Sequence, residues 1–318
     1  MKAIILAAGK GTRLYPVTLT MPKPLVPVAN KALIKYAIET LTNMGATEIG
    51  LVVHSLDSPI RQALGDGLST VGVPLTYIEQ ANPRGLAHAV KVAQPFLGDE
   101  PFLMYLGDNI FQDSMKALTT RFKETGAGAA IALTEVPDPT RFGIAELEGD
   151  HVKRLVEKPK DPPRNLCIVG VYAFGPEIFE SIERTPPSAR GEVEITDAIQ
   201  GLIDAGLEVR KYEIEGWWKD TGKPEDVLDL IAEGRAAGVL LFEENLPSID
   251  VGRTTTTAIQ AAAARSPSGA PAIVAVDQEG GIVARVAGPP SSSASDMGTW
   301  PIASVEAEAT AGSMSRRS

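Results

Sequence analysis

The chain has 318 residues, enough for one large or two medium-sized domains, and its 44% hydrophobic and 22% charged residues are typical of a soluble globular protein. A net charge of −10 argues against the basic face that general nucleic-acid binding requires, and the single cysteine, Cys167, excludes an intrachain disulfide. No apolar run approaches the roughly 20 residues of a membrane span and no signal-peptide pattern is present, so we expect a cytoplasmic protein without membrane contact.

Short apolar runs alternate with helical patterns through the first half of the chain. The predicted strands are Ala3–Leu6, Ile49–Val53, Leu75–Glu79, Phe102–Leu106 and Ala129–Leu133, and the predicted helices are Asn30–Met44, Ala87–Ala93 and Met115–Thr125. This alternation indicates an α/β fold with a Rossmann-like, mostly parallel sheet flanked by helices. In such sheets ligands gather at the carboxyl ends of the strands, so the residues that follow each strand are candidates for a site.

From about Arg141 the pattern changes to shorter strands around a helix. The predicted strands are Gly143–Leu147, Val152–Val156, Ile168–Phe174 and Glu208–Glu213, and the predicted helices are Ile195–Ala205 and Pro224–Ala236. After about Leu230 the composition changes again, with short runs of threonine, alanine and serine. We therefore predict one domain over residues 1–230 and a partly disordered extension over residues 231–318.

The loop after the first strand carries a pattern suited to phosphate. Residues Leu6–Arg13 read Leu-Ala-Ala-Gly-Lys-Gly-Thr-Arg. Gly9 and Gly11 let the main chain approach an anion, and the guanidinium of Arg13 suits a phosphate group. The loop matches neither the dinucleotide fingerprint, because Leu14 stands at the third glycine, nor a P-loop. By spacing alone, an ordinary tight turn explains it about as well.

The residues after this loop resemble the signature of sugar-1-phosphate nucleotidylyltransferases, with Lys23 standing before Pro-Leu-Val-Pro-Val. Further matching motifs follow at Gly85–Ala89, Leu106–Asn109, Phe142–Ile144, Glu157–Pro159, Gly170–Tyr172, Glu194–Asp197 and Trp217–Thr221. Their order and rough spacing are similar to those of glucose-1-phosphate thymidylyltransferases. The resemblance covers about residues 1–230.

The resemblance implies an enzyme that joins dTTP or UTP to glucose-1-phosphate and releases pyrophosphate. An oxygen of the sugar phosphate attacks the α-phosphorus in line, so catalysis consists mostly of positioning and charge neutralisation. The resemblance assigns catalytic roles to Arg13, Lys23 and Lys158, and a bound Mg²⁺ to the carboxylates of Asp108 and Asp220. Taken singly, each side chain also fits an ordinary surface, loop or turn position.

The remaining site residues are implied by the same resemblance. The nucleotide is assigned to Leu6, Ala8, Gly9, Gly11, Thr12, Arg13, Gln80, Gly85 and Leu86, and the sugar to Gly143, Glu157, Lys158 and Val171. The amide of Gln80 can match both donor and acceptor edges of a pyrimidine. The three histidines show no metal-ligand spacing and none is assigned as a general base. His88 stands where many relatives carry glutamine, and both a nucleotide contact and a structural role fit it.

The C-terminal extension resembles the amino-terminal part of β-hexosaminidase-type glycoside hydrolases, through Leu230–Phe242 and the pentapeptide Asp277–Gly281 after a predicted strand at Ala272–Val276. The extension is far shorter than the about 250 residues of a complete (β/α)₈ barrel, and the later catalytic loops of that family have no counterpart. We therefore expect a truncated barrel fragment without hydrolase activity.

Three alternatives remain open from the sequence. Thymine and uracil differ by one methyl group, which gives only about 1–3 kcal/mol of discrimination, so the uridylyl reaction stands beside the thymidylyl reaction. A non-catalytic sugar-nucleotide sensor is disfavoured because the implied phosphate and metal residues are all present, and a glycoside hydrolase is disfavoured by the short extension. Relatives are usually oligomers, so a homo-oligomer is expected.

Overall fold

The computed structural model describes residues 1–9, 11, 21–28, 31–220, 228, 231–234, 238–241 and 249–276. The described residues form two compact units: the first comprises residues 1–9, 11, 21–28 and 31–220, and the second comprises residues 228, 231–234, 238–241 and 249–276. The predicted domain boundary near residue 230 stays a prediction. No helix in the described ranges combines the length and the hydrophobicity that a bilayer crossing needs.

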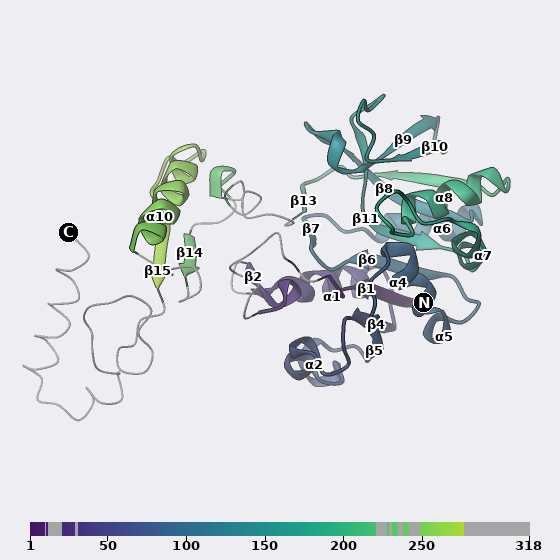
Figure 1. Cartoon of the computed structure of the whole chain (residues 1–318), viewed down its shortest axis with the longest axis horizontal. Helices are drawn as coiled ribbons and strands as arrows, with labels where there is room; N and C mark the ends of the chain where they lie inside the picture. Colours follow the sequence, from purple (N-terminus) through teal and green to yellow (C-terminus); the bar gives the residue numbers. More distant parts are fainter. Residues whose placement is uncertain are drawn as a thin grey trace, which may run out of the picture. The chain divides into compact units, whose positions relative to one another are not determined.

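The first unit is built around a nine-stranded sheet of order β5-β4-β1-β6-β11-β8-β12-β10-β9 (Figure 1). Its strands are β1 (Lys2–Leu6), β4 (Glu48–Val53), β5 (Leu75–Glu79), β6 (Phe102–Leu106), β8 (Ala129–Glu135), β9 (Gly143–Glu148), β10 (His151–Glu157), β11 (Leu166–Phe174) and β12 (Val209–Glu213). Small two-stranded sheets pair β2 (Pro27–Val28) with β3 (Lys31–Ala32), and β7 (Asn109–Phe111) with β13 (Trp218–Asp220).

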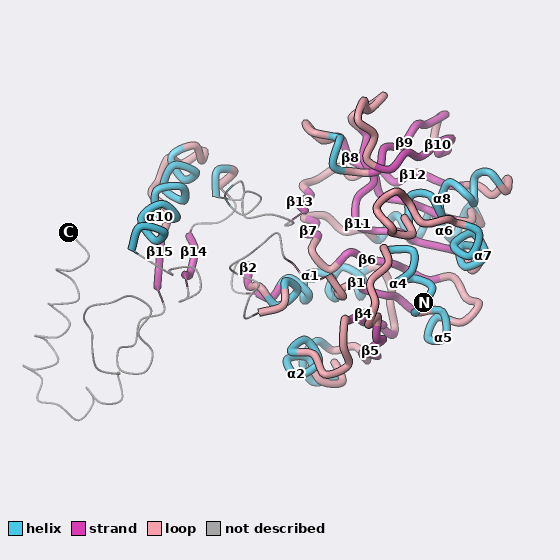
Figure 2. Tube along the Cα trace, in the orientation of Figure 1, coloured by secondary structure: helices cyan, strands magenta, loops and turns pink. Residues whose placement is uncertain are grey.

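The sheet changes direction along its width. Strands β5, β4, β1 and β6 run parallel, as the alternating first half predicts. Strand β11 is antiparallel to both β6 and β8, and the β9–β10 hairpin extends the far end of the sheet (Figure 2). The α/β fold class is therefore confirmed, while the sheet as a whole is mixed rather than mostly parallel. The antiparallel part arises because its strands are joined largely by turns rather than by crossover helices.

Helices cover both faces of this sheet. They are α1 (Leu33–Asn43), α2 (Pro59–Leu64), α3 (Leu68–Val71), α4 (Leu86–Val92), α5 (Gln94–Leu97), α6 (Lys116–Thr125), α7 (Glu177–Arg184) and α8 (Ile195–Asp204), with short 3₁₀ turns η3 (Lys23–Leu25) and η4 (Pro139–Arg141). Side chains alternate along β1: Ala3 and Ile5 belong to a buried cluster that includes residues of α1, α2 and α6, whereas Ile4 belongs to a second cluster that includes residues of α4, α7 and α8. This alternation buries both faces of the sheet and fixes the strand register.

Most predicted elements of this unit are found within two residues of their expected ends. Helix α1 is a correction: it begins at Leu33, because β3 occupies the two preceding residues, and its N-cap Ala32 makes no side-chain capping bond. The predicted cap Asn30 lies outside the described residues, as does most of the predicted helix Pro224–Ala236.

The second unit contains a parallel strand pair joined by a helix. Strands β14 (Gly238–Leu241) and β15 (Ile273–Val276) pair in parallel, and α10 (Ile249–Ala264) connects them. Ile231, Ile259 and Ala262 belong to a small buried cluster, and the amide of Gln260 pairs with both main-chain groups of Ala272. This is one βαβ unit, the repeating element of α/β proteins. The pentapeptide Asp277–Gly281 lies outside the described residues, and the hydrolase resemblance stays a prediction.

Candidate active site

The carboxyl ends of the parallel strands meet at one edge of the sheet, where most of the predicted nucleotide and metal residues lie. Leu6 at the end of β1 is in register with Val52 of β4 and with Leu106 of β6. The main-chain N–H of Gly107 donates to the Leu6 carbonyl at 3.2 Å. The glycine loop and the segment that contains Asp108 therefore leave the sheet side by side, as expected for a ligand site in a parallel sheet.

The described part of the glycine loop is consistent with close approach of its main chain to a ligand. Ala8 is buried, Gly9 is exposed, and Gly11 has a φ of 63°, in the left-handed region that glycine tolerates. Thr12 and Arg13 lie outside the described residues, so their predicted phosphate contacts stay predictions.

Lys23 and Asp108, which are 85 residues apart in sequence, are in direct contact. Lys23 opens the 3₁₀ turn η3 between Pro22 and Pro24, and the residue is only 8% exposed. Its Nζ lies 2.5 Å from Asp108 Oδ2. A buried ammonium on a proline-stiffened turn is held in place with few alternative conformations. The two predicted site residues thus form a charge-assisted hydrogen bond at the edge of the sheet.

Asn109 connects this pair to two other segments and was given no role from the sequence. Its Nδ2 donates to Asp108 Oδ1 at 2.9 Å. Its Oδ1 accepts from the main-chain N–H of Gly170 at 3.3 Å and from Trp218 Nε1 at 2.6 Å. Asn109 is 3% exposed, so these bonds form away from water, where they are stronger and costly to lose. Gly170 is needed here, because a Cβ would overlap the Asn109 amide.

The small β7–β13 sheet places Asp220 next to the segment that contains Asp108 and Asn109. The partner of Asp220 in that antiparallel pair is Asn109, the residue after Asp108. Side-chain relative exposure of Asp108 is 30%, which leaves part of its carboxylate open to a ligand. Among the residues that the structure describes, no group of three or more histidine, cysteine or acidic side chains is arranged to hold a metal ion. Two carboxylates from adjacent strands suit Mg²⁺, which takes one or two protein carboxylates and completes its shell with water and substrate phosphates.

Gln80, Gly85 and Leu86 lie at the end of β5 and the start of α4. The Gln80 N–H donates to the Val53 carbonyl at 2.8 Å, which places Gln80 at the same carboxyl edge as the glycine loop. Gly85 is the N-cap of α4 with φ 103° and ψ 171°, a conformation that is essentially restricted to glycine. A Cβ at Gly85 would overlap the main chain of Val193. The structure thus brings together these three predicted nucleotide residues.

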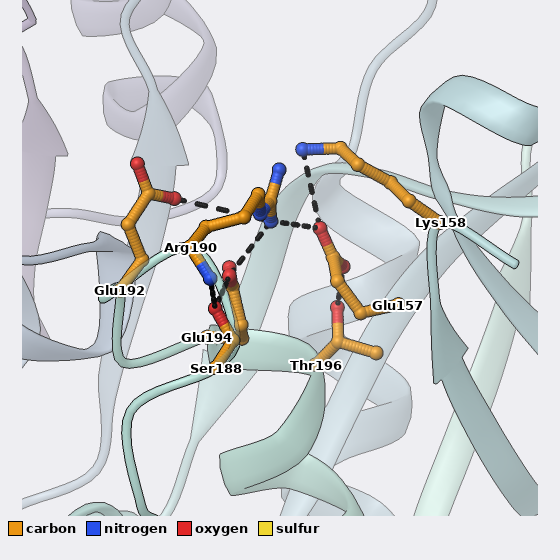
Figure 3. Close-up of polar contacts among 7 residues, drawn as sticks. All are labelled: Glu157, Lys158, Ser188, Arg190, Glu192, Glu194 and Thr196. Atoms are coloured by element: carbon orange, nitrogen blue, oxygen red, sulfur yellow. Dashed lines mark hydrogen bonds and ion pairs between the residues drawn. The ribbon is translucent and has the colours of Figure 1, made fainter.

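Glu157 is the centre of the predicted sugar-binding residues (Figure 3). Its Oε1 lies 3.2 Å from Lys158 Nζ and 3.1 Å from Arg190 Nη2, and its Oε2 accepts from Thr196 Oγ1 at 2.7 Å. A Cβ at Gly143 would meet Thr196 Oγ1 and approach a Glu157 oxygen, so the absence of a side chain lets the main chain of β9 come close. Glu157, Lys158 and Gly143 are therefore neighbours, as the resemblance implied.

Arg190 was missed in the sequence and adds a second cation to this cluster. In addition to Glu157, its Nη2 contacts Glu194 Oε1 at 2.7 Å, and Glu194 also accepts from Ser188 Oγ (Figure 3). Burial alone would lower the pKa of Arg190, but the neighbouring carboxylates, Glu194 first, raise it overall. Burial, followed by the charges of Glu157 and Glu194, raises the pKa of Asp197 nearby. No sequence motif marked Arg190, whereas Glu194 and Thr196 lie in a recognised one.

Val171 differs from the other predicted sugar residues. It is completely buried in β11, where it pairs with Tyr105 of β6. Its side chain belongs to the core of the sheet, so the predicted contact with a sugar stays a prediction for the main chain only.

The loop before α4 is joined by hydrogen bonds to the segment before α8. The N–H of Val193 donates to the Arg84 carbonyl at 2.7 Å, and the N–H of Ala87 donates to the Val193 carbonyl at 3.1 Å. Val193 immediately precedes Glu194, which holds Arg190. The predicted nucleotide loop and the cationic cluster at Glu157 are thus fixed relative to each other by main-chain bonds.

A family model described as Nucleotidyl transferase matches residues 2–236. The chain is 51% identical over 231 residues to the low-salt glycan biosynthesis nucleotidyltransferase Agl11 of Haloferax volcanii, and 48% identical over 232 residues to a glucose-1-phosphate thymidylyltransferase of Streptomyces antibioticus. Both alignments cover 72% of this chain, but only 64% and 65% of those relatives, so the chain spans just under two thirds of their length.

One further relative and one solved structure are also similar to this chain. A UTP–glucose-1-phosphate uridylyltransferase of Haloferax volcanii, AglF, is 39% identical over 71% of this chain and 93% of its own length. A crystal structure from Bacillus anthracis, assigned as a glucose-1-phosphate thymidylyltransferase in complex with sucrose, is 34% identical and superposes with a TM-score of 0.68 over 74% of this chain and 95% of that one. The matched region contains all the predicted site residues of the first unit, and the chain belongs to the nucleotidyl transferase family.

Proposed function

We propose that this enzyme transfers a thymidylyl group from dTTP to glucose-1-phosphate, giving dTDP-glucose and pyrophosphate. The observation that carries the proposal is the convergence of Lys23, Asp108, Asp220 and Gln80 at one edge of a parallel sheet, next to the glycine loop. The family supports nucleotidyl transfer, and the thymidylyltransferase relative supports the choice of substrates.

The reaction is an in-line displacement at the α-phosphorus of the triphosphate. An oxygen of the sugar phosphate forms the new P–O bond, the bond to the β-phosphate oxygen breaks, and pyrophosphate leaves with its electron pair. Both reactants are anions that repel each other, so the protein must neutralise charge and hold the attacking oxygen in line. No protein nucleophile and no proton transfer are required, which agrees with the absence of an assigned general base.

Lys23 neutralises the triphosphate near the reacting phosphorus, and Arg13 is proposed to bind the leaving pyrophosphate. Lys23 is paired with Asp108, and a bound phosphate would offer its ammonium a second anionic partner at the same edge. Asp108 and Asp220 would hold Mg²⁺, which when bound supplies a hard positive charge for the phosphate oxygens. Asn109 keeps the two carboxylate-bearing segments together through Asp108 and Trp218.

The sugar phosphate is proposed to bind at the cluster around Glu157. The ammonium of Lys158 and the guanidinium of Arg190 would bind its phosphate, and the carboxylate of Glu157 would accept hydrogen bonds from sugar hydroxyls. Side-chain exposures of 42% and 43% leave the two cations accessible to a ligand.

The test is pyrophosphate release by the full chain with Mg²⁺, glucose-1-phosphate and either dTTP or UTP. Release that requires both substrates, and that falls at least about 100-fold in Asp108→Asn, supports the proposal. Asp150→Asn, a change at an exposed carboxylate in the β9–β10 turn, is the matched control and should leave activity unchanged. Unaltered turnover in Asp108→Asn would refute the proposed metal and phosphate site.

The uridylyl reaction is the second candidate, because AglF is similar over most of the first unit and the two bases differ by one methyl group. Equal kcat/KM for dTTP and UTP would refute a thymidylyl preference while leaving nucleotidyl transfer intact. The predicted homo-oligomer, cytoplasmic location and inactive C-terminal extension stay predictions.

A further inference from the structure

The side-chain contacts of Gln80 determine the orientation of its amide group. The residue is 4% exposed and follows β5 directly. Its Nε2 lies 2.9 Å from His88 Nδ1 in α4 and 3.4 Å from the Gly85 carbonyl oxygen. Both neighbours come from the turn and helix that follow β5, and both contact the same amide nitrogen.

The carbonyl of Gly85 decides which end of the amide faces this corner. A carbonyl oxygen only accepts hydrogen bonds, so the NH₂ group of Gln80, and not its oxygen, must point toward it. The same NH₂ then meets His88 Nδ1, which must be the unprotonated acceptor nitrogen. The imidazole proton of neutral His88 is therefore on Nε2, because the hydrogen bond of one ring nitrogen fixes the tautomer of the other.

The electrostatic surroundings keep this imidazole neutral. Burial, and then the positive charge of Arg84, lower the pKa of His88 below its ordinary value of 6.5. Lys91 of α4 is paired with Glu183 of α7. At pH 7.5 His88 can thus act as an acceptor toward Gln80.

The amide oxygen is left for a ligand. No hydrogen bond to Gln80 Oε1 occurs within the described chain, while the nitrogen contacts two acceptors. We propose that His88 is a positioning residue for base selection: it holds the Gln80 amide with its oxygen presented to the base, so that the site takes pyrimidines with a ring N3–H, thymine and uracil, in preference to cytosine. The inference rests on the proposed function, within which Gln80 reads the base.

The hydrogen-bonding groups of the bases explain why thymine and uracil should be preferred to cytosine. Thymine and uracil carry a donor at N3, which pairs with an amide oxygen, whereas cytosine has an acceptor at N3 and would face that oxygen without a hydrogen bond. A cytosine bound in the same position could be hydrogen-bonded at N3 only if the amide turned over, which would break the bond between Gln80 and His88 and place the amide oxygen against the Gly85 carbonyl. The 4-amino donor of cytosine lies at the neighbouring ring position, so using that donor instead would require the base to shift. Loss of the neutral hydrogen bond between Gln80 and His88 should therefore change the dCTP-to-dTTP ratio of kcat/KM by about 2- to 10-fold.

The experiment compares kcat/KM for dTTP and dCTP with glucose-1-phosphate at pH 7.5 in the full chain. His88→Leu removes the acceptor and should raise the dCTP-to-dTTP ratio about 2- to 10-fold, mainly through a higher KM for dTTP. His88→Gln supplies an amide oxygen as a new acceptor and should restore the wild-type ratio. His54→Leu, at an exposed histidine, is the control and should leave the ratio unchanged.

The ratio separates base selection from general damage, because a merely structural role would lower both efficiencies together. An unchanged ratio in His88→Leu would overturn the proposal. A wild-type protein that turns over neither triphosphate would refute the proposed function instead.

A second readout does not depend on turnover. Imidazole ¹⁵N chemical shifts of the histidine-labelled protein, with His88 assigned by its loss in His88→Gln, should show the Nε2–H tautomer. A proton on Nδ1 would contradict the arrangement even in an inactive protein.

Discussion

Lys158 offers a test that separates catalysis from stability at one position. In the described chain it is the single non-glycine residue with a positive φ, 40°, and its side chain carries a proposed phosphate-binding ammonium. Its N–H donates to the Phe142 carbonyl at 3.1 Å, which ties the residue after β10 to the start of β9 and holds it in this conformation. Lys158→Gly and Lys158→Ala both remove the ammonium, but only glycine adopts the left-handed conformation without strain.

The expected difference in stability between Lys158→Gly and Lys158→Ala follows from two opposing contributions, backbone strain and conformational entropy. The left-handed conformation costs a residue with a Cβ roughly 1–2 kcal/mol, and glycine loses about 0.5–1 kcal/mol more conformational entropy than alanine on folding. The ion pair with Glu157 is lost in both variants and cancels. Lys158→Gly should therefore be more stable than Lys158→Ala by about 0.5–1 kcal/mol. For a domain of this size, the difference corresponds to about 1–4 °C in Tm.

Urea unfolding of both variants measures the stability difference, and pyrophosphate release measures activity. Both variants should raise the KM for glucose-1-phosphate and lower kcat/KM at least about 10-fold, since each has lost one charge-assisted phosphate contact. Equal unfolding free energies in the glycine and alanine variants would refute the strain argument. Wild-type kcat/KM in either variant would refute the phosphate contact.

Three further predictions concern the framework of the site. Gly85→Ala should destabilise the protein by about 2 kcal/mol or more in urea unfolding, because the φ and ψ of Gly85 suit only glycine and an added Cβ would overlap Val193. Gly149→Ala is the control: Gly149 has a positive φ but open space around it, so this change should cost only about 1 kcal/mol. Asn109→Ala leaves Trp218 Nε1–H and one buried main-chain N–H without their acceptor and should cost about 2–5 kcal/mol of unfolding free energy; a smaller loss than 1 kcal/mol would contradict the role of this amide. A chelator should abolish pyrophosphate release, added Mg²⁺ should restore it, and activity that persists in the chelator would exclude the metal.

The parallel half of the fold could be predicted because its strands are continuous apolar runs. Phe102–Leu106 is buried on both faces of the sheet, and its observed ends coincide with the predicted ones. The ends of the edge strand Leu75–Glu79 were also predicted correctly, although Thr76 and Glu79 are exposed. The antiparallel direction of β11 is not encoded in its own apolar pattern, since a strand buried on both faces reads the same whichever way its neighbours run. The short β7 and β13 strands were also missed, because three residues carry too little periodicity to recognise.

Individual site residues could be assigned only where a motif already carried a role. Lys23 and Asp108 lay in recognised motifs, and they are found in contact. Asn109 lay in the same motif as Asp108, but its function is to satisfy donors from β11 and β13, and those neighbours exist only after folding. Arg190 had no motif at all; its position beside Glu157 depends on how the loop before α8 folds.

The hydrogen bonds of Val193 link the two parts of the sheet to which the two substrates are proposed to bind. Gln80 and Gly85 follow a parallel strand, whereas Glu157 and Arg190 belong to the antiparallel half and the loop before α8. An in-line attack requires the sugar phosphate and the α-phosphorus to be fixed within a fraction of an ångström, which two independently moving loops could not achieve. Because Val193 bonds to the main chain on both sides of Gly85, a displacement of the nucleotide loop must also displace the segment that positions Arg190. Within the proposed function, main-chain bonds thus fix the relative positions of the two substrates, while side chains such as Gln80 and Glu157 contact the base and the sugar.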